Sequence, residues 1–123
     1  MFVDRSLAGR ELVVFGDGEQ TRDFIYVADL VRAIMAATFD GRATDGAPIN
    51  LATGRQTSVN QLAAEVARLC SSNAGVRHAP ARAGEIRHSV AAVARAAEVL
   101  RFRAETTLSD GLAETIDWIR RGS

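Results

Sequence analysis

The chain has no lysine. All fifteen of its basic residues are arginine, and fifteen acidic residues balance them, so the formal net charge at neutral pH is zero. Proteins that bind nucleic acids or membrane surfaces usually carry a basic excess, so this balance argues against both partners. No apolar run approaches the length of a membrane span. With one cysteine, Cys70, the chain cannot form an internal disulfide, and this favours a cytoplasmic protein.

Potential metal ligands are also scarce. The only two histidines, His78 and His88, do not stand at metal-ligand spacing from each other or from the lone cysteine. Three acids recur every six residues, namely Asp17, Asp23 and Asp29, but this spacing does not match that of a calcium-binding loop. We therefore predict no metal site, and interpret Asp23 and Asp29 as acids that cap backbone groups.

The 123 residues fit a single domain, 1–123, with a modest core. Short apolar, β-prone runs predict three strands: 11–15, 48–52 and 76–78. Helical periodicity predicts about four helices, which begin near Val27, Ser58, Val90 and Thr107, and residues 2–9 are interpreted as the end of another. Short strands that alternate with helices are typical of a small α/β or α+β domain.

Several helix starts carry capping residues. Ser58 with Gln61 has the spacing of a capping box, and Thr107 with Asp110 suggests a second capped start. In the helix between them, Ser89 is the candidate cap.

Two segments contain the residue types that bind phosphates. Residues 16–23, G-D-G-E-Q-T-R-D, form a glycine turn that can approach a ligand closely, followed by Arg22, whose planar fork suits phosphate oxygens. Residues 80–85, P-A-R-A-G-E, form a second glycine-containing loop, in which Arg82 stands three residues before Glu85. Each segment taken alone is more often an ordinary loop.

Taken together and in order, four segments resemble the NAD-dependent epimerase/dehydratase family, the extended short-chain dehydrogenases that include UDP-glucose 4-epimerase. They are residues 16–33, 50–54, 82–85 and 108–118. The resemblance places the whole chain in the carboxy-terminal, substrate-binding part of such an enzyme, without its main Rossmann domain. It also implies that Trp118 is a packing anchor.

The resemblance implies roles for five residues. Arg22 and Arg82 would contact the diphosphate of a nucleoside diphosphate sugar, and Glu85 would accept hydrogen bonds from the ribose. The backbone of Val13 and Phe15 would line the uracil or other base. UDP-glucose or UDP-galactose is our first candidate substrate.

No catalytic or cofactor-binding residue is predicted in this chain, although the family implies NAD for the full-length enzyme. The family's catalytic tyrosine is followed four residues later by a lysine that lowers its pKa. Here the only tyrosine, Tyr26, is followed by Leu30. The Gly16-x-Gly18 turn lacks the third glycine and the directly following helix of a dinucleotide fingerprint.

Two functional hypotheses remain open. The chain is either the substrate-binding portion of a nucleotide-sugar epimerase or dehydratase, truncated and not competent alone, or a stand-alone, non-catalytic module that binds sugar nucleotides or assembles with another protein. In the family, residues 24–35 and 48–52 pack against or join the sheet of the amino-terminal half. Without that half we expect exposed apolar stripes and strand edges, weak nucleotide affinity and a homo-oligomer.

Overall fold

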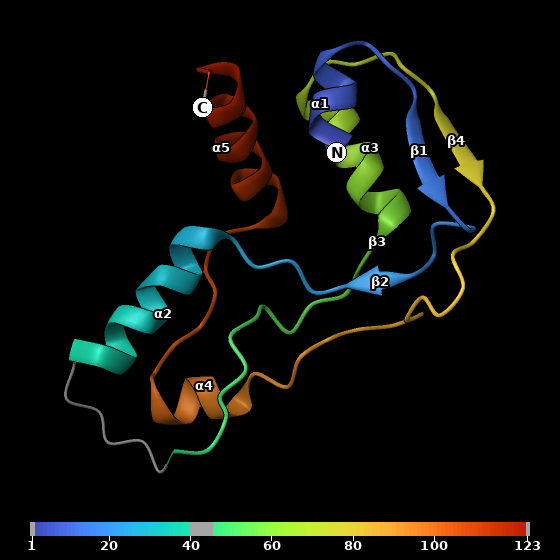
Figure 1. Cartoon of the computed structure of the whole chain (residues 1–123). Helices are drawn as coiled ribbons and strands as arrows, with labels where there is room; N and C mark the ends of the chain where they lie inside the picture. The colour runs from blue at the N-terminus through green and yellow to red at the C-terminus, as the bar shows by residue number, and fades with distance from the viewer. Residues whose placement is uncertain (1, 40–45, 123) are drawn as a thin grey trace.

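The computed structural model describes residues 2–39 and 46–122. Within these residues the chain forms five helices and four short strands (Figure 1). In chain order they are α1 (Phe2–Leu7), β1 (Leu12–Phe15), β2 (Thr21–Arg22), α2 (Val27–Phe39), β3 (Thr57–Ser58), α3 (Val59–Leu69), β4 (Val76–Ala79), α4 (Ala94–Val99) and α5 (Leu108–Arg120). The predicted small α/β domain of short strands and helices is confirmed, and α1 lies within residues 2–9, which the sequence marked as the end of a further helix.

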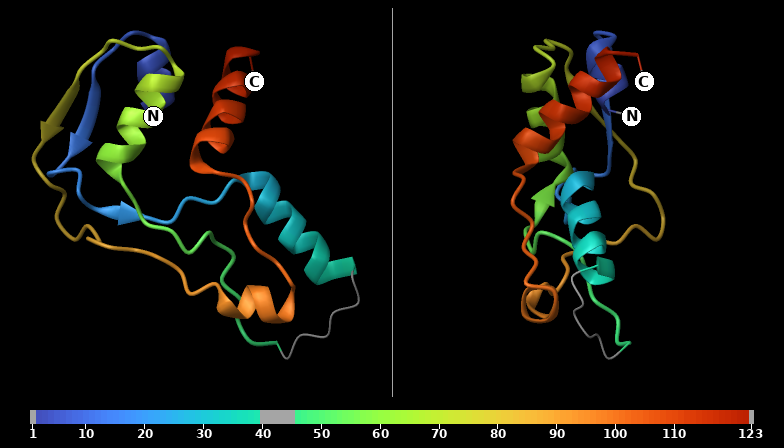
Figure 2. Two further views of the ribbon diagram at one scale, coloured as in Figure 1. Left: turned by 180° about the vertical axis from the view of Figure 1, so that it is seen from behind. Right: turned by 90° about the vertical axis from the view of Figure 1, so that its left-hand side faces the viewer.

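The elements form two groups, and the chain passes between them near β2 and β3 (Figures 1 and 2). The larger group contains α1, α3, α5, β1 and β4. The buried residues of its hydrophobic core are Val3, Leu12, Val14, Ala63, Val66 and Ile116. The smaller group contains α2 and α4, around Ala33, Ala96, Leu100 and Phe102. The fold therefore has separate small cores, so its stability depends strongly on the contacts that connect the two groups.

The four strands of the described residues form two sheets of two strands each. β1 pairs with β4 in parallel, with Val14 opposite His78, and β2 pairs with β3 in antiparallel orientation. Along β1 the buried and half-buried positions alternate, as the two-residue period of a strand requires. Leu12 and Val14 pack against α1 and α3, which leaves Val13 and Phe15 facing the other way.

Helix α3 begins with the predicted capping box. The Ser58 hydroxyl accepts a hydrogen bond from the Gln61 amide at 3.1 Å, and the Gln61 side chain accepts one from the Ser58 amide at 2.8 Å. At α5, the Thr107 hydroxyl accepts from the Asp110 amide. These bonds satisfy backbone donors that a helix start leaves unpaired, so both starts are fixed by local sequence.

The predicted strand over residues 48–52 is wrong. No residue of that segment is in a strand, and no described strand lies beside it to pair with. A strand exists only where a neighbour completes its hydrogen bonds, so apolar composition alone did not determine the outcome. Ile49 and Leu51 instead pack against the core of α2 and α4.

Helix α4 is shorter than expected, and Ser89 does not cap it. The cap position is Val93, which offers no side-chain bond, while the Ser89 amide donates to the carbonyl of Thr21. Pairing of residues 87–89 with Thr21 keeps this segment extended, so the helix begins only at Ala94. After α4, Arg101 has a φ of 51°, the left-handed region that favours glycine.

Asp23 and Asp29 bind backbone amides far along the chain, as predicted. Asp23 accepts hydrogen bonds from the amides of Thr53 and Gly54, both at 2.9 Å. Asp29, which is buried, accepts from the amides of Glu105 and Thr106 at 3.1 and 2.9 Å. Each carboxylate thus joins segments that secondary structure does not connect.

A wide apolar surface faces solvent. On α2, five large apolar side chains are between 51% and 71% exposed: Val27, Val31, Ile34, Met35 and Phe39. Trp118 on α5 is 61% exposed, so the expectation that it anchors packing is wrong for the part of the chain described here. It lines a groove with Tyr26 and Val27, next to the start of α2. None of the described helices is both long and apolar enough to cross a membrane.

Candidate functional site

A cavity of about 500 Å³ lies beside β1. Its lining residues are Phe2, Arg5, Val13, Phe15, Gln20, Val59, Arg82 and Glu85. A second hollow of about 210 Å³ shares Gln20, Arg82 and Glu85 with it and extends toward Asp17 and Arg87. Four of the five predicted site residues therefore line one cavity, although they come from segments almost seventy residues apart.

One edge of β1 is open toward this cavity. The amides of Leu12 and Gly16 donate to carbonyls on the β4 side, and backbone groups alternate between the two edges of a strand. The N–H and C=O groups of Val13 and Phe15 therefore point to the opposite edge, where no described strand pairs with them. The Phe15 carbonyl confirms this direction, because it accepts a hydrogen bond from the Gln20 side chain at 2.8 Å.

Gln20 connects the strand to the loop that carries Arg82 and Glu85. Its amide nitrogen donates to Phe15 and lies 3.4 Å from a carboxylate oxygen of Glu85. Arg82 places its guanidinium carbon 3.9 Å from the centre of the Phe15 ring, a cation–π contact that holds the positive charge over the cavity. These contacts position a cation and an anion side by side at the Phe15 end of β1.

Arg22 lies next to this cavity but does not line it. Its Nη1 donates to the carbonyls of Thr21 and Ile86, both at 2.7 Å, and Nη2 is 3.6 Å from Glu85. The side chain therefore fastens the segment of Glu85 and Ile86 to β2. Nε and Nη2 make no hydrogen bond within the described residues.

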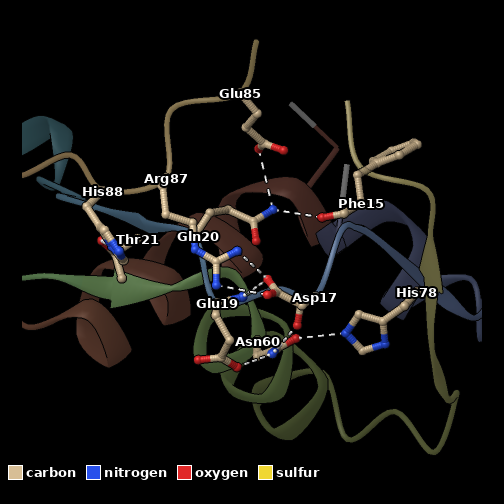
Figure 3. Close-up of polar contacts among 10 residues, drawn as sticks. All are labelled: Phe15, Asp17, Glu19, Gln20, Thr21, Asn60, His78, Glu85, Arg87 and His88. Atoms are coloured by element: carbon tan, nitrogen blue, oxygen red, sulfur yellow. Dashed lines mark hydrogen bonds and ion pairs between the residues drawn. The ribbon is translucent and has the colours of Figure 1, made fainter. Parts of the chain in front are cut away.

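A polar network fixes the glycine turn of residues 16–18 (Figure 3). Asp17 pairs with Arg87 at 2.8 Å, and this hydrogen bond lowers the pKa of Asp17 below its ordinary value. The Asn60 side chain donates to the Asp17 carbonyl and to Glu19, and its oxygen lies 3.1 Å from Nε2 of His78. The turn is thus tied to α3, β4 and the loop before α4.

The same network explains why residue 18 is a glycine. Its φ is 76°, and a Cβ added there would lie 1.9 Å from the Asn60 side-chain oxygen. Glycine is required to admit Asn60, and the turn leads into β2 with no helix behind it. The residues present therefore do not fit the phosphate cradle of a dinucleotide, and we assign no NAD-binding role to this turn.

The two histidines hydrogen-bond to neighbouring side chains, His78 with Asn60 and His88 with the Thr21 hydroxyl at 3.1 Å. Among the residues described, no three potential ligands cluster in a way that could hold a metal ion.

Sequence reasoning missed several lining residues, above all Gln20, Arg5 and Phe2. Gln20 belongs to the recognised glycine-turn segment, but a glutamine there has no chemical signature of its own. Arg5 and Phe2 reach the cavity only because α1 packs beside β1. No sequence pattern signals that contact.

Comparison with known proteins gives the relationships of the chain. Residues 1–52 match the family described as "NAD dependent epimerase/dehydratase family". UDP-glucose 4-epimerase of Mycolicibacterium smegmatis is 35% identical over 123 residues, which are 100% of this chain and 39% of that protein. UDP-N-acetyl-alpha-D-glucosaminuronate decarboxylase of Bacillus cytotoxicus is 32% identical over 125 residues, 97% of this chain and 38% of that protein.

A crystal structure of UDP-glucose 4-epimerase from Thermotoga maritima, with UDP-glucose, superposes with a TM-score of 0.91 at 35% identity. The match covers 98% of this chain and 38% of that one. The chain thus spans about two fifths of the length of these relatives. It belongs to the NAD-dependent epimerase/dehydratase family and corresponds to the carboxy-terminal portion of its members.

Proposed function

We propose that this chain is the nucleotide-sugar-binding portion of an NAD-dependent epimerase or dehydratase, with a UDP-hexose such as UDP-glucose or UDP-galactose as its first candidate ligand. One observation carries the proposal. Val13, Phe15, Arg82 and Glu85 line a single cavity whose size suits a nucleotide. The relatives named for UDP sugars and the solved epimerase with UDP-glucose support the same ligand class. With one cysteine in the chain, we expect the protein in the cytosol.

The charges of the site suit a diphosphate. Arg82 stands over Phe15 inside the cavity. Arg22 lies nearby, with Nη2 paired to Glu85 and no hydrogen bond from Nε within the described residues. Guanidinium groups bind phosphate oxygens through paired, charge-assisted hydrogen bonds. Glu85 is held by Gln20 and Arg22, and its carboxylate can accept hydrogen bonds from the two ribose hydroxyls.

The open edge of β1 suits the base. Val13 and Phe15 present a donor, an acceptor and a second donor in sequence: the Val13 amide, the Val13 carbonyl and the Phe15 amide. Uracil and thymine present the complementary order of carbonyl, N–H and carbonyl. We therefore place an imide base against this edge, with its ribose toward Glu85.

The binding role is tested by removing each arginine. We expect Arg82→Ala to raise the Kd for UDP about tenfold, because it removes a charge-assisted contact that is not fully shielded from water. Arg22→Ala is expected to have a similar effect. Calorimetric titration with UDP measures both. Arg77→Ala is the matched control, since this exposed arginine pairs with Glu11, the residue before β1, and does not line the cavity. Unchanged affinity in both site variants would disprove the assignment.

The chain by itself is expected to have no epimerase or dehydratase activity. It lacks the Tyr-x-x-x-Lys pair, has no lysine to replace it, and its glycine turn does not fit a dinucleotide. Purified protein incubated with NAD and UDP-galactose should form no UDP-glucose above a blank. Turnover above the blank, lost in Arg82→Ala, would overturn this expectation.

The alternative function is a non-catalytic module that binds sugar nucleotides or assembles with a protein. The exposed apolar surface of α2 and Trp118 favours assembly. The two functions share the cavity, so nucleotide binding does not separate them. Restoration of NAD-dependent turnover by a separately supplied family dinucleotide-binding half would favour the enzyme portion.

A further inference from the structure

Two side chains, Gln20 and Arg5, bind backbone carbonyls at the two ends of the unpaired edge of β1. Arg5 has no role assigned so far. At the carboxyl end, Gln20 donates to the Phe15 carbonyl. At the amino end, Nε of Arg5 donates to the Glu11 carbonyl at 2.6 Å. Glu11 is an odd-numbered neighbour of Val13 and Phe15, so its carbonyl lies on the same edge. Between these two anchors the backbone groups of Val13 remain open.

Arg5 has donors to spare. Its single hydrogen bond within the described residues uses Nε, so Nη1 and Nη2 are unpaired. The hydrogen bond fixes the position of the guanidinium plane beside the strand. The side chain comes from α1 and lines the same cavity as Val13, Phe15 and Arg82. Because the guanidinium is held in place and lines a nucleotide-sized cavity, its remaining N–H groups can donate hydrogen bonds to a bound ligand.

Distance along the strand separates Arg5 from the proposed diphosphate site. Arg82, Glu85 and Gln20 gather at the Phe15 end, and the carbonyls of Glu11 and Phe15 are four residues apart, about 13 Å along an extended chain. Glu11 and Val13 are only about 7 Å apart. A base bound to the Val13 edge would therefore lie between Arg82 and Arg5, with Arg5 beside the ring and away from the phosphates.

We propose that Arg5 reads the nucleobase. This proposal rests on the proposed function. The terminal nitrogens of Arg5 donate hydrogen bonds to a ring carbonyl of an imide base, uracil or thymine, and the β1 backbone binds the remaining imide groups. Guanidinium has only donors, so it stabilises a ring carbonyl. The amino group of adenine is itself a donor and cannot accept a hydrogen bond from it. Arg5 then contributes to base selectivity without contacting the diphosphate.

The test compares UDP with ADP, which has the same ribose and diphosphate but no base carbonyl. Titrations of the native chain, Arg5→Met and Arg10→Met are followed by calorimetry or ligand-observed NMR. Methionine keeps the length and apolar stem of the side chain, and Arg10 is an exposed arginine outside the cavity lining. We expect Arg5→Met to raise the Kd for UDP about fivefold to tenfold and to leave ADP unchanged. Arg10→Met is expected to change neither.

Unchanged UDP affinity in Arg5→Met would overturn the proposal. An equal loss for UDP and ADP would also overturn it, because Arg5 would then act on the phosphates or on the fold. Thermal unfolding checks the fold. If Arg5→Met unfolds early, Arg5→Gln, which keeps an N–H for the Glu11 carbonyl, is expected to show the same selective loss. If UDP affinity depends on Arg82 and not on Arg5, the role of Arg5 is overturned and the proposed function still holds. No UDP binding by the native chain would defeat the proposed function as well.

Discussion

Replacement of Asp29 by alanine is expected to destabilise the domain by about 3–4 kcal/mol. The carboxylate is buried and accepts hydrogen bonds from the amides of Glu105 and Thr106 and from Arg32. Both amide hydrogen bonds are partly buried, and a buried donor left without a partner costs about 1–3 kcal/mol. Urea unfolding of Asp29→Ala measures the loss. Asp117→Ala is the control, because its ion pair with Arg120 is exposed and is worth well under 1 kcal/mol.

The same carboxylate makes the domain sensitive to acid. Burial opposes its ionisation most strongly, but the hydrogen bonds from Arg32, Thr106 and Glu105 together hold the pKa of Asp29 below its ordinary value. A folded-state pKa below the unfolded one stabilises the fold above about pH 4, and this contribution is lost as the pH falls through the folded-state pKa. Asp29→Asn is expected to be less stable at neutral pH and to lose less stability on acidification. Equal acid sensitivity in both proteins would contradict this account.

Local sequence determined the elements whose stabilising contacts are local. The capping box at Ser58 and the capped start at Thr107 depend on residues three apart, and both are present as predicted. The strand predicted over 11–15 is present as Leu12–Phe15, because its apolar residues and the turn that ends it are adjacent in the sequence. The segment at 48–52 has similar composition but no neighbour to pair with, so its strand is absent. Pairing between distant segments is a property that composition does not contain.

The candidate site shows the same division. Motif resemblance selected Val13, Phe15, Arg82 and Glu85, and the fold gathers them at one cavity. It did not reveal that Arg22 donates to the Ile86 carbonyl, or that Gln20 links Phe15 to Glu85. Those contacts depend on the position that the loop of residues 80–88 takes in the folded chain. Arg5 was missed for a related reason, since only the packing of α1 brings it to the strand edge.

The exposed face of α2 is expected to make the chain a homo-oligomer, most simply a twofold dimer. Its apolar side chains recur at helical spacing along one side, while the core-facing residues of the same helix are Asp29 and Ala33. Trp118 and Tyr26 extend the apolar surface at the start of α2. Surfaces of this kind mark interfaces, and a single patch that meets its own copy closes with twofold symmetry. Balanced charges on the rest of the surface oppose general precipitation.

A single charge in this face should separate the subunits. Ile34 is half exposed, so Ile34→Glu costs the isolated subunit little, yet it would bury an unpaired carboxylate at the interface. Light scattering at micromolar concentration is expected to give a dimer mass for the native chain and a monomer mass for Ile34→Glu. Ala64→Glu places the same charge at an exposed position on α3 and is expected to leave the dimer intact. A monomer mass for the native chain would show that this face stays in contact with water, and a dimer that survives Ile34→Glu would place the interface elsewhere.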